Sequence, residues 1–433
     1  MHPIQEIIAA HKSGSHAGIF SCCSANEYAL RAVMRKCKEK GLPALIESTA
    51  NQVNQDGGYT GQTPKDFYHW CLALAKQEQF DPKALILGGD HLGPLTWTHL
   101  HEKDAMANAR RLIHEYVLAG FTKIHIDTSM RLASDDSTKP LSDSLIAQRG
   151  AELCAVAEEA FSQRKKEQPN ATPPVYVIGS EVPIPGGALE QEALGVTSSE
   201  NCRATISAFR DAFEERGLSH VWTRVAAIVV QPGVEFSEDD VFVYDSEKAR
   251  ALCQTIKDEP LVFEGHSTDY QPPAALRNMI RDGIVILKVG PALTFALREA
   301  LFALEHIETI SLRGRGAVLS GFSDALETAM LENPGYWNKH YHGDGFKQRT
   351  NRAYGFSDRA RYYLNEPIVQ TSISRLVKNL EKPIPLPLLS QFMPIQYARV
   401  RDSLIPNSVD ALILDRIGGC IDDYIFALEQ KDL

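Results

Sequence analysis

Short runs of apolar residues recur through the first 290 positions of the chain, and each run has the length of one strand. Several of them (LILGG, VYVIG, VAAIVV and IVILKV) are apolar at nearly every position. Such runs are typical of strands that are buried on both faces of a parallel sheet. The predicted strands lie at 17–21, 44–47, 84–88, 123–127, 175–181, 224–230, 261–264 and 284–289.

Many of the gaps between these strands carry a helical pattern. Between the third and fourth strands, Ala105, Ala109, Leu112 and Tyr116 fall on one face at helical spacing, and Gly120 marks the end of that helix. Strands that alternate with helices are expected to be parallel and joined by right-handed crossovers. Eight such units favour a closed (β/α)8 TIM barrel, with an open doubly wound sheet as the alternative.

The alternation stops after the eighth strand. TFALREALFALEHI predicts a strong helix, and residues from about 308 onward no longer alternate between strand and helix. The tail contains SDRARYYL at 357–364, an apolar helix at about 368–380 and a proline-rich stretch at 382–394. We therefore predict an α/β chain in which residues 1–307 form the barrel and residues 308–433 form a helical extension packed on it.

Composition narrows the functional class. The chain has 433 residues, is 44% hydrophobic and carries a formal net charge of −10, which is not the profile of a nucleic-acid binder or a polybasic membrane-surface protein. No run of 18 apolar residues predicts a membrane span, and the N-terminus reads as a charged amphipathic helix rather than a signal peptide. The eight cysteines are scattered without metal-ligand spacing, as expected for reduced thiols in the cytoplasm.

Polar side chains gather at the ends of the predicted strands, where TIM barrels place their chemistry. One strand-end acid is most often a helix cap or loop anchor, but here the pattern recurs on seven strands. Converging carboxylates repel one another unless a cation, a proton or a basic ligand lies between them. The residues are Glu47, Ser48, Asp90, His91, Asp127, Glu181, Gln231, Glu264, His266 and Lys288.

Two neighbouring segments suggest how a ligand is held. Gly290 and Pro291 begin the helix after the eighth strand, and free N–H groups of Ala292 and Leu293 could hold an anion there. The alternative is that Gly-Pro is only a helix start. The long loop at 47–61, which contains Asn51, could serve as a lid or bind sugar hydroxyls, although such polar loops are common. Glu47, Asn51, Asp127, Lys288 and Gly290 are the predicted substrate-binding residues.

Several segments in fixed order resemble one known family. They include IESTANQVNQDGGYTG, ILGGDHLGP, KIHIDTSM, EGHSTDYQ and ILKVGPALTFALREALFAL, and the likeness continues through SDRARYYL and SQFMP in the tail. The chain resembles the Z-type subunit of D-tagatose-1,6-bisphosphate aldolase. That resemblance implies a non-catalytic partner needed for the activity and stability of a separate catalytic subunit, in galactitol and N-acetylgalactosamine breakdown. Some members have carried the name tagatose-6-phosphate kinase, but the sequence has no GxxxxGK[ST] motif.

A more distant resemblance is to the zinc-dependent class II aldolases. Their metal histidine in an Asp-His pair matches Asp90-His91. Their other two histidines would fall on Pro232 and Glu264, and proline has no side-chain donor atom. The resemblance therefore implies that the usual aldolase zinc site is not formed.

An altered metal site remains a second hypothesis. His91, Glu264 and His266, with Asp127 or Glu181, offer nitrogen and oxygen ligands for a divalent metal such as zinc or manganese. Such a site could polarise a ketose carbonyl, with Asp90 and Glu181 as the predicted catalytic groups. Two functions follow: an accessory subunit that binds the catalytic aldolase, or a metal-dependent epimerase or aldolase acting on a ketose or its phosphate.

Overall fold

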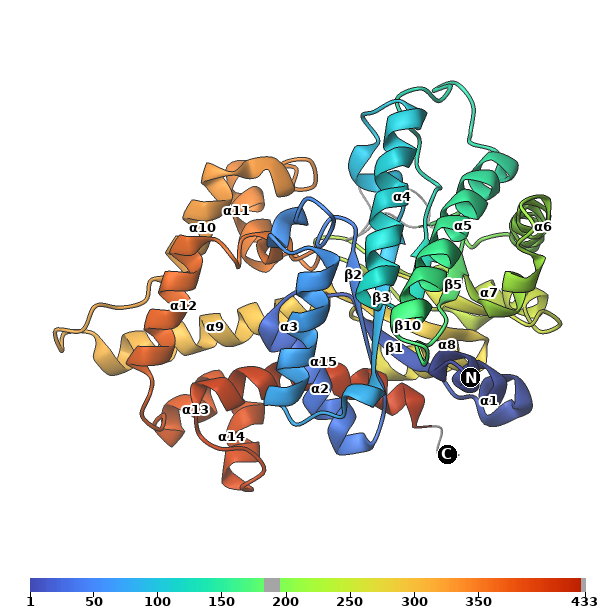
Figure 1. Ribbon diagram of the computed structural model, residues 1–433. Coiled ribbons are helices and arrows are strands. Elements are labelled where there is room, and N and C mark those ends of the chain that lie inside the picture. Colours follow the sequence, from blue (N-terminus) through green and yellow to red (C-terminus); the bar gives the residue numbers. More distant parts are fainter. Residues whose placement is uncertain (183–194, 430–433) are drawn as a thin grey trace.

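Eight parallel strands close into a barrel surrounded by helices in the computed structural model, which describes residues 1–182 and 195–429 (Figure 1). The order around the barrel is β1-β2-β3-β4-β5-β6-β9-β10. All eight predicted strands are confirmed, with shifted ends. Their bounds are Ile19–Cys22 (β1), Ala44–Thr49 (β2), Leu85–Leu92 (β3), Lys123–Ile126 (β4), Val175–Ile178 (β5), Val225–Val230 (β6), Val262–Gly265 (β9) and Ile284–Val289 (β10).

A two-stranded antiparallel ribbon outside the barrel was not predicted. It pairs β7 (Glu235–Phe236) with β8 (Val241–Phe242), between β6 and the helix that follows. Two-residue strands carry no periodic signal, so the apolar pattern could not reveal them.

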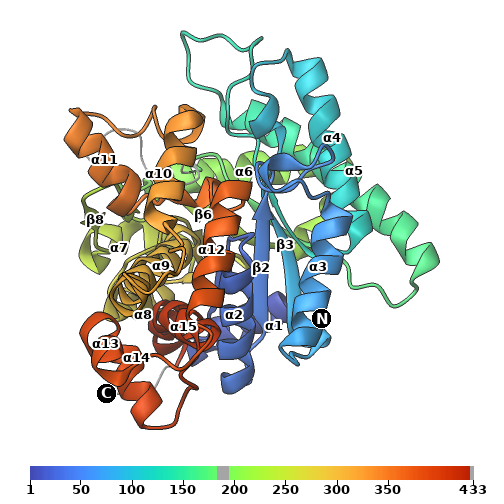
Figure 2. The same ribbon diagram turned by 90° about the vertical axis from the view of Figure 1, so that its left-hand side faces the viewer.

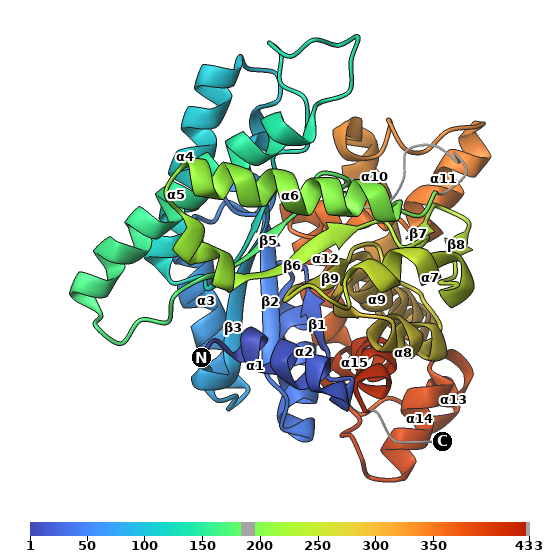
Figure 3. The same cartoon turned by 90° about the vertical axis from the view of Figure 1, so that its right-hand side faces the viewer.

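The lower part of the barrel interior is apolar and closed by the N-terminal helix. Ile4 and Ile8 of α1 (Pro3–Ala10) pack with Leu45, Ile86 and other barrel-lining residues. His2 begins this helix with a capping box, which satisfies its first backbone N–H groups. The predicted amphipathic helix therefore closes one end of the barrel, at the lower end of the strands in Figure 3, and leaves the other end for the site.

A helix after each of the first seven barrel strands forms most of the outer layer. The predicted stripe of α4 is fully buried, and Gly120 ends that helix with a positive φ of 116°. The bounds are Glu27–Lys40 (α2), Pro64–Gln77 (α3), Glu102–Ala119 (α4), Asp143–Glu167 (α5), Ser199–Glu215 (α6), Ser246–Thr255 (α7) and Pro273–Arg281 (α8).

Two helices cover the barrel at the place that one helix after the eighth strand would fill. After β10, α9 (Pro291–Leu312) runs across residue 307 and extends away from the barrel, and α15 (Val409–Leu428) returns to pack against α2, α8 and α9. In Figures 1 and 2 the remaining helices of the extension, coloured orange to red, lie beside α9. They are Phe322–Glu332 (α10), Gly345–Tyr354 (α11), Pro367–Asn379 (α12), Leu386–Phe392 (α13) and Pro394–Arg401 (α14). Among the described residues, no helix is both long and apolar enough to cross a membrane.

Candidate functional site

A layer of buried charges lies above the apolar part of the barrel interior. Lys123 of β4 donates to Glu47 of β2, with Nζ at 2.7 Å from Oε1 and 2.8 Å from Oε2, and forms an ion pair with Glu264 of β9 at 2.7 Å. All three side chains are fully buried. Gly88 makes room for this layer, because a Cβ there would lie 2.8 Å from Cγ of Glu47. The glycine on β3 is therefore part of what admits the carboxylate.

Lys288 of β10 joins this layer to the residues above it. Its ammonium group contacts Asp90 and lies 3.2 Å from Oε1 of Glu264 and 3.6 Å from Oε2 of Glu47. Burial alone would lower the pKa of Lys288, but the three carboxylates outweigh burial and hold this pKa well above its usual value. Lys288 therefore stays charged and neutralises acids that would otherwise repel one another.

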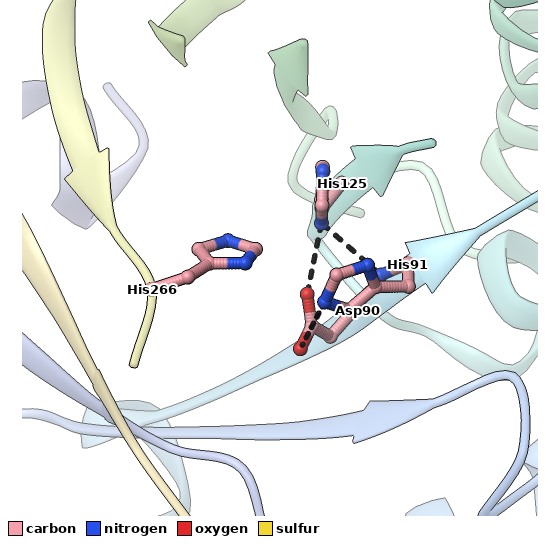
Figure 4. A group of neighbouring side chains, drawn as sticks. All are labelled: Asp90, His91, His125 and His266. Atoms are coloured by element: carbon pink, nitrogen blue, oxygen red, sulfur yellow. Dashed lines mark hydrogen bonds and ion pairs between the residues drawn. The ribbon is translucent and has the colours of Figure 1, made fainter. Parts of the chain in front are cut away.

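Four side chains converge directly above Lys288: Asp90, His91, His125 and His266 (Figure 4). Each offers one ligand atom, and these atoms all lie within 4.8 Å of one another. The ring centroids of His91 and His125, and of His91 and His266, are 5.0 Å apart, and those of His125 and His266 are 5.2 Å apart. Three imidazoles and a carboxylate thus share one small volume.

Neighbouring carboxylates fix the orientation of two of the rings. Nδ1 of His91 lies 2.8 Å from Oδ2 of Asp127, and Nε2 of His266 lies 3.0 Å from Oε1 of Glu264. Each ring therefore keeps its second nitrogen for another partner. Metal-binding histidines are commonly held in this way.

His125 supplies the clearest sign of a missing partner. Its Nδ1 receives the backbone N–H of His91 at 3.1 Å and lies 2.8 Å from Oδ1 of Asp90, whereas its buried Nε2 has no hydrogen-bond partner. A buried polar atom without a partner costs free energy, so a ligand is expected to compensate it. Imidazole nitrogens with one carboxylate are a donor set that suits zinc and related divalent metals.

Charge states in this group differ between the histidines. Burial, together with the charge of Lys288, lowers the pKa of His266 to about 3, so this ring is neutral at neutral pH. Burial also lowers the pKa of His125. For His91 the carboxylates of Asp90 and Asp127 outweigh burial and raise the pKa. Two of the three rings therefore already have the neutral form that a metal requires.

The backbone is strained at the end of β3. His91 has a positive φ of 48°, and the register with β4 shifts between Gly89 and Leu92. Only glycine fits at position 93, because a Cβ there would lie 1.7 Å from the carbonyl oxygen of Asp127. Strain of this kind persists where the surrounding structure enforces it, and it commonly marks functional sites.

A cavity of about 80 Å³ opens beside Asp90, His91 and His266. The loop after β2 forms one wall and the extension contributes another. The lining residues are Cys23, Thr49, Asn51, Gln52, Tyr59, Asp90, His91, Phe236, His266, Ser267, Asp269, Lys288, Val289, Gly290, Pro291, Arg361 and Tyr362.

Hydrogen bonds within the loop after β2 hold it as a fixed wall. Tyr59 donates its N–H to the carbonyl of Asn51, and Thr60 donates its hydroxyl to the carbonyl of Gln52 at 2.7 Å. Gly58 permits this closure, because a Cβ there would lie 2.4 Å from the Gln52 carbonyl oxygen. The loop is thus arranged to contact a ligand through Asn51 and Gln52.

Most of the predicted site residues meet at this end of the barrel. Asn51, Asp90, His91, His266, Lys288 and Gly290 line the cavity, and Glu47, Asp127 and Glu264 lie buried behind it. The structure does not bring Glu264 into the possible ligand group, because two lysines and His266 already engage its carboxylate. It also leaves Glu181 apart. That side chain is exposed three residues beyond β5 and accepts a hydrogen bond from Asn201 at 2.7 Å.

The N–H groups that were expected to be free at the start of α9 are already bonded within the protein. Asp269 accepts the N–H groups of Gly290 at 3.0 Å and Ala292 at 2.8 Å, and Leu293 donates to the carbonyl of Gly290. A carboxylate of the protein therefore occupies the place where an anion was expected. Burial raises the pKa of Asp269 to about 6, although the two N–H groups act in the opposite direction.

Sequence reasoning missed several residues that shape the site, among them Lys123, His125, Arg361 and Tyr362. His125 was detectable, because it lies two positions before Asp127 on the predicted strand 123–127 and alternate residues of a strand face the same side. Arg361 and Tyr362 come from the short helix η7 (Arg359–Tyr362) in the extension, and no pattern in the sequence links them to the strand ends.

Residues 4–429 match the family model described as D-tagatose-1,6-bisphosphate aldolase subunit GatZ/KbaZ-like. The chain belongs to this family. A crystal structure of a "probable tagatose 6 phosphate kinase" from Sinorhizobium meliloti 1021 is similar at 42% identity and a TM-score of 0.86, over 95% of this chain and 100% of the other.

Aldolase structures are more distant. The YdjI aldolase from Escherichia coli K12 shares 14% identity over 86% of this chain and 96% of its own, with a TM-score of 0.37. A fructose-bisphosphate aldolase from Campylobacter jejuni also shares 14% identity, over 87% and 92%, with a TM-score of 0.41. The family membership rests on the first two comparisons alone.

Proposed function

We propose that this chain is an accessory subunit of D-tagatose-1,6-bisphosphate aldolase, required for the full activity and stability of a catalytic subunit. The observation that carries the proposal is the identity of residues 232 and 264. Class II aldolases, which this chain resembles, have zinc-binding histidines at the matching positions, whereas this chain has Pro232 and Glu264. Pro232 has no donor atom, and the carboxylate of Glu264 pairs with Lys123 and Lys288. Membership of the aldolase subunit family over residues 4–429 supports the same conclusion. We place this role in the cytoplasm, in galactitol and N-acetylgalactosamine breakdown.

Co-expression with a catalytic tagatose-bisphosphate aldolase subunit tests this proposal. We expect the two chains to co-purify, and the complex to cleave tagatose 1,6-bisphosphate faster and survive heating longer than the catalytic subunit alone. Vigorous cleavage by the isolated chain would contradict the accessory role. So would a catalytic subunit whose rate and thermal inactivation are the same with and without this chain.

A second candidate is a metal-dependent epimerase or aldolase that acts on a ketose phosphate without a partner. The specific observation in its favour is the group Asp90, His91, His125 and His266, of which all but His125 line the cavity. These four side chains would hold a divalent metal, which would supply a Lewis acid for a ketose carbonyl. Lys288 would keep the charge of Asp90 balanced, and Asp127 would keep the ring of His91 in position.

Metal content tests the second candidate without relying on turnover. On that candidate the purified chain retains about one zinc or manganese ion per molecule after dialysis, and H125A retains much less. H306A is the matched control, because His306 lies on α9 and contacts Phe392 instead of the site. Equal metal content in H125A and H306A would exclude His125 as a ligand. A separate measurement supports the second candidate: the metal-loaded chain, without a partner, should catalyse isotope exchange or epimerisation of tagatose 6-phosphate.

A further inference from the structure

Arg361 is the one strongly basic side chain that the extension contributes to the cavity lining, among the residues that the structure describes. Its guanidinium donates to the backbone carbonyls of Ser357 at 2.5 Å and Asp358 at 2.9 Å, and to the hydroxyl of Tyr362 at 3.0 Å. The charged carbon also lies 4.4 Å from the centroid of the Tyr362 ring. These contacts hold the guanidinium in a fixed position at the cavity wall.

No carboxylate among the described residues lies within 4.0 Å of this guanidinium, although acids are abundant nearby. Asp90 is engaged by Lys288, and Asp269 is engaged by the backbone of Gly290 and Ala292. Arg361 is partly buried, and Asp358 and Asp269 act on it without direct contact. A ligand that brings a negative charge into contact with the guanidinium would therefore stabilise it. The planar guanidinium is also the side chain best suited to binding phosphate with two hydrogen bonds.

A second arginine strengthens the positive potential at this wall. Arg359 is only 5% exposed and lies 3.4 Å from the Tyr362 hydroxyl. Burial would raise the pKa of Tyr362, but Arg361 and Arg359 outweigh it and lower this pKa. The same two guanidinium groups would favour a negative charge on a ligand beside Tyr362.

Helix N-termini do not offer an alternative anion site here. Asp269 occupies the first N–H groups of α9, and the side chain of Asn26 accepts those of Tyr28 and Ala29 at the start of α2. An anionic ligand in this cavity would therefore be held by side chains.

We propose that Arg361 binds the phosphate group of a ketose phosphate and so directs its sugar end toward Asp90, His91 and His266. Asn51 and Tyr59 belong to the loop after β2, and the centroid of the Tyr59 ring lies 4.9 Å from that of Tyr362; these two residues would contact the sugar between the two ends. This inference rests on the second candidate function in one respect, namely that the cavity binds a ketose phosphate. It adds that the C-terminal extension completes the ligand site.

Calorimetric titration of the isolated chain with D-tagatose 6-phosphate and with D-tagatose tests the assignment. We expect R361Q to weaken binding of the phosphate ester about 10- to 100-fold, the effect of losing hydrogen bonds to a charged group. Its affinity for D-tagatose should stay within about twofold of the wild type, because only the phosphate contact is lost. R361K should fall in between, since lysine keeps the charge but not the planar fork. R349Q is the matched control on an exposed helix of the extension and should bind both ligands normally.

Arg361 also supports its own loop, so circular dichroism and thermal unfolding must accompany the titrations. If R361Q does not fold, R361K decides the question by the same comparison of two ligands. Wild-type binding of the phosphate ester should also weaken as ionic strength rises. The proposal is overturned if the wild type does not bind D-tagatose 6-phosphate, or if the arginine variants lose affinity for both ligands equally. Neither result touches the accessory role, which is measured separately by activation of the catalytic subunit.

Discussion

Replacing Lys123 with methionine tests whether the buried charge layer is a coupled unit. The change removes an ammonium group that makes two hydrogen bonds to Glu47 and an ion pair with Glu264, and keeps a similar side-chain length. All of these groups have no exposed surface, so water cannot replace the lost partner. Glu264 and Glu47 would then have Lys288 as their remaining lysine partner, at 3.2 and 3.6 Å, and Asp90 already contacts that lysine.

The expected loss follows from these contacts. Removing one partner of a buried ion pair costs about 3–5 kcal/mol, because the other partner is left without compensation. Lys288 remains, and Ser21 still donates to Glu47 at 2.5 Å, so the loss should not exceed that range. E47Q combined with K123M removes one surplus charge and should restore about 1–3 kcal/mol relative to K123M alone, which is a typical coupling between contacting residues.

Urea unfolding followed by both tryptophan fluorescence and circular dichroism provides the measurement, since coincident curves are needed before a free energy is assigned. K40M is the control, because Lys40 forms an ion pair with Glu429 at the surface, and its unfolding midpoint should match the wild type. A loss below about 1 kcal/mol for K123M would refute the reasoning. Strict additivity of K123M and E47Q would refute the coupling.

Three further substitutions probe other parts of the site and barrel. G93A should destabilise the chain by at least about 3 kcal/mol or prevent soluble expression, because the added Cβ would lie 1.7 Å from the carbonyl oxygen of Asp127. G419A is the control in the same unfolding assay, because a Cβ at Gly419 would have no neighbouring atom within 4 Å. D269N should flatten the pH dependence of stability. The pKa of Asp269 is raised from 3.8 to about 6, so its contribution to stability, at most about 3 kcal/mol, is complete below pH 3.8 and is lost as pH rises through 6. Parallel curves of stability against pH for the wild type and D269N would contradict this. I4A should lower the free energy of unfolding by about 2–4 kcal/mol, because it opens a void at the end of the barrel that α1 closes. I310A, at an exposed position, is the control and should change this free energy little. Equal unfolding midpoints for the two variants would show that α1 does not close the barrel.

The barrel itself could be predicted from local patterns. Strands such as β6 and β10 are apolar at nearly every position, and the buried stripe of α4 repeats at helical spacing. Chemistry at the strand ends followed from the geometry of parallel strands, which bring their carboxyl ends to one rim. Asp90, His91, His266 and Lys288 were found in this way. Period-two alternation along β4 could have added His125 to them.

Tertiary structure alone decided the roles of the individual groups. Glu264 and Glu181 are both strand-end acids, yet one is neutralised by two buried lysines and the other is exposed beside Asn201, a difference set by neighbours distant in sequence. Asp269 takes the backbone N–H groups expected for an anion, because the segment after β9 lies beside the start of α9. Arg361 reaches the cavity only through the packing of the extension on the barrel. Local periodicity fixes which face of an element is buried, but which side chains meet across that surface depends on how the elements pack.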